Sequence, residues 1–124
     1  MIKLDIKSSK PLYEQIIEQI KYHVIKGYLK PGDPIPSVRR LAIELKITPS
    51  TVAKAYQELE RQKVIETIRA KGTFIAESVS LKPDEEKLEA IRKEITSLMM
   101  ELKLMGFSRQ DAVKMVSEQY NSLK

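Results

Sequence analysis

Proline limits what the first half of this chain can fold into. Four of the six prolines in the 124 residues lie between residues 31 and 49. Proline lacks the backbone N–H that a residue inside a helix must donate, so it is tolerated mainly in the first helical turn. We therefore expect turns around Pro31-Gly32, and a new helix that begins at Thr48-Pro49 with the threonine as its N-cap.

Three amphipathic helices fit the segments that these prolines leave. The first is predicted over residues 11–26, where four apolar residues recur at spacings of four: Leu12, Ile16, Ile20 and Val24. Ser37 can cap a short second helix, which gives way to a tight turn at Lys46-Ile47. The third helix, from 48 to about 62, places four residues inward: Val52, Ala55, Tyr56 and Leu59. Two short helices joined by a tight turn after a longer helix predict a helix-turn-helix.

Two β-prone runs follow these helices, at residues 64–69 and 72–77. Only Ala70-Lys71 lies between them, so the pair is predicted to be a β-hairpin, and Gly72 supplies the backbone freedom that the turn needs. A hairpin that follows a helix-turn-helix is called a wing. The sequence thus predicts a winged helix-turn-helix domain over residues 1–77.

The rest of the chain is predicted to be a helical tail. Residues 78–82 fit a linker, and residues 83–124 fit two helices separated by Gly106. The second tail helix can be capped by Ser108, with Asp111 three residues further on. The fold class expected for the whole chain is therefore mostly α with a small β-hairpin, an α+β arrangement.

An apolar seam runs along the first tail helix. Six apolar residues alternate at spacings of three and four, which is the a/d pattern of a coiled coil: Leu88, Ile91, Ile95, Leu98, Leu102 and Met105. A seam this regular is longer than one short neighbouring helix can cover, so we expect it to join two copies of the chain as a homodimer. The alternative is that the tail helices pack onto the winged domain.

Charge is distributed unevenly along the chain. The net charge is +5, and residues 1–77 account for all of it, with 14 Lys and Arg against 9 Asp and Glu. Residues 78–124 carry 8 of each kind. An excess of positive charge confined to one domain suggests a polyanionic partner for that domain.

Composition excludes several classes of function. The chain has no cysteine and a single histidine, His23, so we expect no disulfide, no metal site and no catalytic triad. The four glycines form no phosphate-binding loop, and we expect neither an enzyme nor a bound cofactor. No apolar run is long enough for a membrane span or a signal peptide, so a cytoplasmic protein is expected.

The order of these elements resembles a known family. The stretch PLYEQIIEQIKYHVIKGYLKPGDPIPS, followed by VRRLAIELKITPSTVAKAYQELERQKVIETIRAKGTFI, is similar to the GntR family of winged helix-turn-helix transcriptional regulators over residues 9–77. The TPSTV turn and the short tail resemble the YtrA-like subfamily. The resemblance implies a repressor that binds an inverted-repeat operator as a homodimer, with a transporter operon as its target. The residues themselves do not identify an effector.

Family position and helix geometry together give the expected DNA-binding residues. A recognition helix enters the major groove by its N-terminal end, where five residues can reach DNA: Thr48, Pro49, Ser50, Thr51 and Lys54. The preceding helix adds Ser37, Arg39 and Arg40. The wing tip adds Arg69, Lys71 and Gly72, which the resemblance directs to the minor groove. The structural alternatives are capping and turn packing for the hydroxyls, a solvated face for the arginines and a plain basic turn for the wing.

The chain departs from the family at three positions. Pro49 and Ala53 stand where many members carry arginines in the recognition helix, so the guanine contacts of those members cannot be carried over. Ala70 stands at the wing tip where a glycine is usual.

A protein-interaction module is the rival function, but it would need an apolar recognition face. The face from Thr48 to Lys54 is small, polar and basic.

Overall fold

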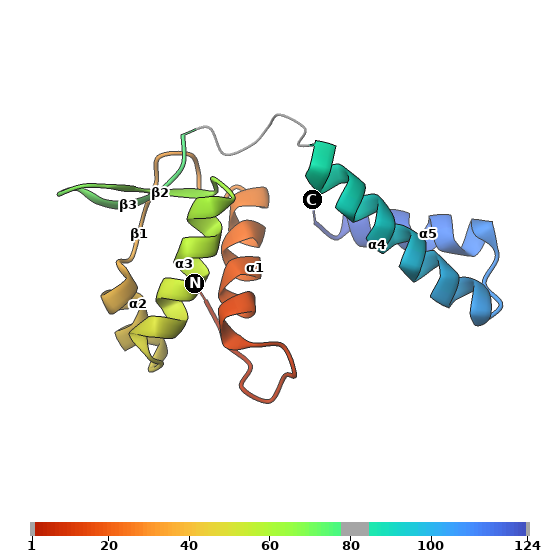
Figure 1. Ribbon diagram of the computed structural model, residues 1–124, viewed down its shortest axis with the longest axis horizontal. Coiled ribbons are helices and arrows are strands. Elements are labelled where there is room, and N and C mark those ends of the chain that lie inside the picture. Colours follow the sequence, from red (N-terminus) through yellow and green to blue (C-terminus); the bar gives the residue numbers. More distant parts are fainter. Residues whose placement is uncertain (1, 78–84, 124) are drawn as a thin grey trace. The chain divides into compact units, whose positions relative to one another are not determined.

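The computed structural model describes residues 2–77 and 85–123, which belong to two compact units, Met1–Ser80 and Leu81–Lys124. Within the described residues there are five helices and three strands (Figure 1). The predicted linker at 78–82 and the predicted helix start at 83–84 lie outside the described residues. The expected fold class, mostly α with a small β element, is confirmed.

Three helices form the framework of the first unit. Helices α1 (Leu12–Ile25) and α2 (Val38–Leu45) both pack against α3 (Pro49–Arg61). The side chains between them are almost inaccessible, and the largest of these are Ile16, Ile20, Leu41, Val52 and Leu59. Burying an aliphatic side chain of this size stabilises the fold by about 1.5–3 kcal/mol. The inward residues expected on the third helix are all buried, which confirms that part of the pattern.

The turn between α2 and α3 follows from local backbone chemistry. Ser37 caps α2 as expected, because its hydroxyl accepts a hydrogen bond of 3.1 Å from the Arg40 N–H. Lys46 ends the helix in the left-handed conformation with φ of 58°. Pro49 then occupies the first turn of α3, where its missing N–H costs nothing. The two helices are therefore joined by a tight turn, as predicted.

The sheet has one strand more than the hairpin that the sequence predicts. Strands β2 (Ile65–Ile68) and β3 (Gly72–Ile75) form the hairpin, and β1 (Pro34–Ile35) pairs antiparallel with the other edge of β3. The segment that contains β1 was expected to be only a turn. Proline is tolerated there because β1 is an edge strand, where one side of the backbone needs no partner.

The second unit consists of two helices, α4 (Glu85–Leu104) and α5 (Arg109–Asn121). The turn between them contains Gly106, with φ of 86°, and α5 begins with the expected capping box. In that box the Ser108 hydroxyl accepts from the Asp111 N–H at 3.1 Å, and the Asp111 carboxylate accepts from the Ser108 N–H at 2.9 Å.

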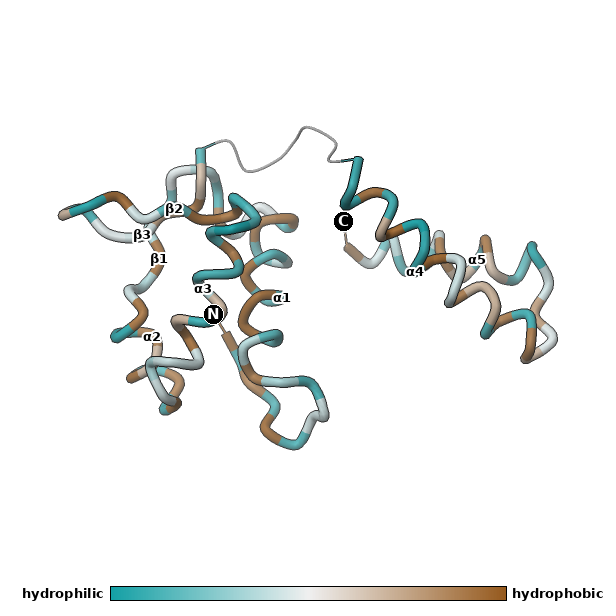
Figure 2. The backbone as a smooth tube through the Cα atoms, viewed as in Figure 1, coloured by the Kyte–Doolittle hydropathy of each residue, from teal (hydrophilic) through white to brown (hydrophobic). Residues whose placement is uncertain are grey.

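Apolar side chains of the second unit remain accessible to solvent. No residue of α4 or α5 is buried, although apolar residues recur along both helices (Figure 2). The two helices also border a groove of about 530 Å³ whose lining includes Met99, Phe107 and Val113. None of the described helices is both long and apolar enough to cross a membrane.

Candidate nucleic-acid interface

The N-terminal end of α3 carries a cluster of hydroxyl groups. Thr48 lies at the N-cap, and its hydroxyl contacts the hydroxyls of Ser50 at 3.1 Å and Thr51 at 2.9 Å. Thr48 is thus the N-cap, as expected, but its side chain makes no capping hydrogen bond because its partners are the two neighbouring hydroxyls. The first turn of α3 contains no acid. The partial positive charge of the helix end is therefore not offset from within its own first turn, and such an end suits a phosphate group.

The two arginines of α2 are not equivalent. Both side chains are exposed, but the Arg40 guanidinium lies 3.2 Å from the Glu44 carboxylate one turn further on. Arg39 has no ion pair among the described residues. Arg39 is therefore the arginine whose positive charge is available to a polyanion, while Ser37 already serves as the α2 cap.

The wing tip holds two further cations. Arg69, Ala70 and Lys71 form the turn between the strands, so the turn has three residues rather than the two expected from the sequence. The Lys71 N–H donates to the Ile68 carbonyl at 2.9 Å, and Gly72 begins β3 with φ of 123°. The side chains of Arg69 and Lys71 are exposed, and no acid among the described residues forms an ion pair with either.

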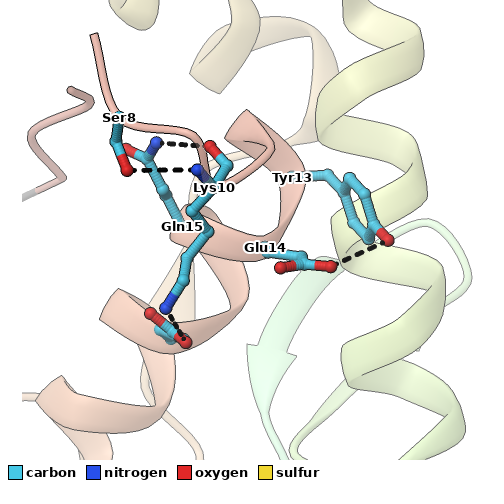
Figure 3. Close-up of polar contacts among 6 residues, drawn as sticks. Ser8, Lys10, Tyr13, Glu14 and Gln15 are labelled. Carbon is cyan, nitrogen blue, oxygen red and sulfur yellow. Dashed lines mark hydrogen bonds and ion pairs between the residues drawn. The ribbon is translucent and has the colours of Figure 1, made fainter. Parts of the chain in front are cut away.

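Lys54 lies beside an aromatic ring that the sequence reasoning did not single out. Its ammonium nitrogen is 4.0 Å from the centroid of the Tyr13 ring, on α1. The Tyr13 hydroxyl donates to the Glu14 carboxylate at 3.3 Å (Figure 3). The negative charge of Glu14, together with desolvation, raises the pKa of Tyr13. The apolar periodicity of α1 places Tyr13 next to Leu12 on that helix. It does not predict that the Tyr13 ring contacts a lysine of another helix.

Two opposite charges in the C-terminal half of α3, Glu58 and Arg61, form an ion pair. The Arg61 guanidinium and the Gln62 amide both donate to the Glu58 carboxylate, with distances of 2.9 Å and 2.8 Å. These hydrogen bonds, with that from Arg61 the larger cause, lower the pKa of Glu58 to about 2. The positive charge of Arg61 is thereby paired within α3. On α2, α3 and the wing, the cations with no ion pair among the described residues are therefore Arg39, Lys54, Arg69 and Lys71.

These elements have a definite arrangement within the first unit. In the view of Figure 1, the wing extends on the side of α3 that α2 occupies, and α1 lies on the opposite side. A three-helix unit with a terminal wing, an acid-free first turn on its third helix and exposed cations on its second helix and at its wing defines a winged helix-turn-helix regulator.

Comparison with known proteins identifies the family. Residues 12–75 match the family model described as bacterial regulatory proteins, gntR family. The chain is 42% identical to the HTH-type transcriptional repressor YtrA of Bacillus subtilis (strain 168), over 95% of this chain and 91% of the relative. The chain belongs to the GntR family, and the resemblance to its YtrA-like members is confirmed. Its relatives are transcriptional regulators rather than enzymes, so the protein is a transcriptional regulator.

Solved structures agree with this assignment. A crystal structure described as a transcriptional antiterminator from Listeria monocytogenes EGD-e has a TM-score of 0.90 and 38% identity, over 99% of this chain and 92% of that one. The DNA-binding domain of AraR in complex with its operator ORE1 has a TM-score of 0.52 and 26% identity. That match covers 61% of this chain and 93% of the AraR chain.

Proposed function

We propose that the protein is a repressor that binds an inverted-repeat operator as a homodimer. The observation that carries the proposal is the acid-free first turn of α3 with its exposed hydroxyls, in the same unit as three exposed cations, Arg39, Arg69 and Lys71, that form no ion pair among the described residues. Phosphate contacts supply most of the affinity of such an interface, and contacts to the grooves supply its selectivity. Two relatives add support, since YtrA is named a repressor and AraR was solved on its operator.

The proposed DNA contacts divide among three elements. The N-terminus of α3 would enter the major groove with Thr48, Pro49, Ser50 and Thr51. Arg39 would contact the backbone from α2, with smaller contributions from Ser37 and Arg40, which have partners within the protein. Arg69, Lys71 and Gly72 would meet the minor groove at the wing tip.

The dimer would form through the seam on α4. Four seam residues are exposed, from 43% for Ile91 and 49% for Ile95 to 55% for Leu98 and 66% for Met105. Leu88 and Leu102 are half-buried. So much accessible apolar surface on one helix is unusual in a monomer, and the seam of a second copy, packed against it as in a coiled coil, would cover it.

The domains we propose are therefore 1–77 for DNA binding and 83–124 for dimerisation. The target that we propose is a transporter operon, as the sequence resemblance implies.

Selection of bound duplexes from a random pool tests this function directly. We expect the full-length protein to enrich an inverted repeat whose half-sites are centred about one helical turn, or a multiple of one turn, apart. Such spacing would report two linked copies. Enrichment of a single unrepeated half-site would contradict the homodimeric operator, and a pool without enrichment would contradict sequence-specific binding itself.

A further inference from the structure

The contact between Tyr13 and Lys54 bears on how the recognition helix reads DNA. Lys54 lies one turn into α3, at a position from which an extended lysine could reach either a base edge or a phosphate. Its ammonium nitrogen instead lies over the Tyr13 ring, 4.0 Å from the centroid. That separation is well within the range of about 6 Å over which the face of an aromatic ring attracts a cation. The ring thus restricts a side chain that otherwise has many rotamers.

Tyr13 is well suited to hold this lysine because its own place is fixed. The amide of Gln15, which is buried, donates to the carbonyls of Lys10 at 2.9 Å and Asp5 at 3.0 Å. The same amide accepts from the Asp5 N–H at 2.8 Å. These bonds tie the first turn of α1 to the segment that precedes it, and Figure 3 shows the one between Gln15 and Lys10. The Tyr13 ring therefore extends from an anchored helix end.

The position of the ring determines the direction in which Lys54 can act. In Figure 1, α1 lies on the opposite side of α3 from the wing. When α3 lies in a major groove with the wing toward the neighbouring minor groove, the α1 side faces the other phosphate backbone of that groove. A lysine held against α1 points to this backbone and away from the base edges at the floor of the groove.

We propose that Tyr13 is a positioning residue that presents the Lys54 ammonium to a backbone phosphate. The inference rests on the proposed function, because it assumes that α3 enters the major groove. It makes Lys54 a source of affinity rather than of sequence preference. It also gives Tyr13 a role in DNA binding through Lys54 rather than through a contact of its own.

A double-mutant cycle on the selected operator tests this role. The full-length variants are Tyr13→Leu, Lys54→Ala and the combination, with Tyr13→Phe as the matched control that keeps the ring and removes only the hydroxyl. We expect Tyr13→Leu to weaken binding about two- to fivefold and Tyr13→Phe to bind like the unmodified protein. The double variant should bind no more weakly than Lys54→Ala alone, because the ring acts only through the lysine.

Salt titration and single-base variants of the operator complete the test. Lys54→Ala should flatten the salt dependence by about 0.9 for each phosphate that is no longer neutralised, or about 1.8 for a dimer, and should weaken binding equally on all operator variants. Additive effects in the cycle, an equally weakened Tyr13→Phe, or relaxed preference at one base pair in Lys54→Ala would each overturn the proposal. Thermal melting establishes that every variant is folded. If the unmodified protein binds no duplex, the proposed function has failed instead.

Discussion

Ala70 is held in a backbone conformation that costs a residue with a Cβ atom. Its φ is 68°, at the position where the family resemblance implies a glycine. Left-handed backbone costs a non-glycine residue about 1–2 kcal/mol, although glycine has a larger entropy in the unfolded chain. We expect Ala70→Gly to increase the free energy of unfolding by about 0.5–1 kcal/mol. Urea unfolding at a fixed protein concentration measures this change as a higher midpoint with an unchanged slope.

The matched control is Ala53→Gly, which places the same substitution inside α3. Glycine in a helix interior should lower the free energy of unfolding by about 1 kcal/mol, the opposite sign. A midpoint for Ala70→Gly that stays the same or falls would mean that the wing turn holds no relievable strain.

The partners of single side chains at the interface could not be predicted from the sequence. The sequence identified Lys54 from its place on the recognition helix, but the partner that orients it lies 41 residues earlier, on another helix. The residues alone made Arg39 and Arg40 equal candidates, whereas the ion pair between Arg40 and Glu44 separates their roles. Such partners depend on helix packing angles and rotamers, and a one-dimensional periodicity does not contain either.

At the scale of elements, the wing offers a separable test of DNA binding. Arg69→Ala with Lys71→Ala removes two exposed cations per subunit and touches no core residue. We expect weaker binding and a salt dependence that is flatter by about 0.9 for each phosphate that these cations would otherwise neutralise. The effect should be larger on operators with A·T-rich flanks, where the minor groove is narrow and attracts basic side chains.

The control for the wing is a variant that removes two exposed lysines from outside the proposed interface, Lys30→Ala with Lys63→Ala. Its salt dependence should match that of the unmodified protein. A folded wing variant with unchanged affinity and slope would leave recognition to α2 and α3 alone.

The elements themselves were largely predictable, and the exception is informative. The helices and the hairpin follow from periodicity, capping residues and glycine positions, all of which are local signals. Strand β1 was missed because it is two residues long and contains a proline, so it has no local signal. Its pairing depends on β3, which lies about 40 residues further along the chain.

At the scale of the whole molecule, the α4 seam should determine the oligomeric state. We expect Ile95→Asp in the full-length chain to sediment as a monomer, because a buried carboxylate would have no partner in an apolar seam. Truncation after residue 80 should have the same effect. Either change should weaken operator binding by orders of magnitude, because two linked half-site contacts become one.

Thr96→Asp is the matched control for the seam. Thr96 is the next residue on α4 but lies off the a/d positions, so this variant should remain a dimer. A dimeric Ile95→Asp variant, or a dimer of residues 1–80, would place the interface elsewhere.

Strand β1 has a consequence for how the protein tolerates different operators. The Gly32 N–H donates to the Ile75 carbonyl and the Ile75 N–H donates to the Asp33 carbonyl, both at 2.8 Å, so the wing is bonded to the segment that leads into α2. The Tyr56 hydroxyl of α3 donates to the Pro36 carbonyl of the same segment at 2.7 Å. Because the wing and the recognition helix are both bonded to this segment, the fold sets the distance between them. An operator whose grooves do not match that distance has to bend or twist in order to bind. The free energy of this deformation depends on the DNA sequence, so base pairs that the protein does not contact also affect the binding affinity.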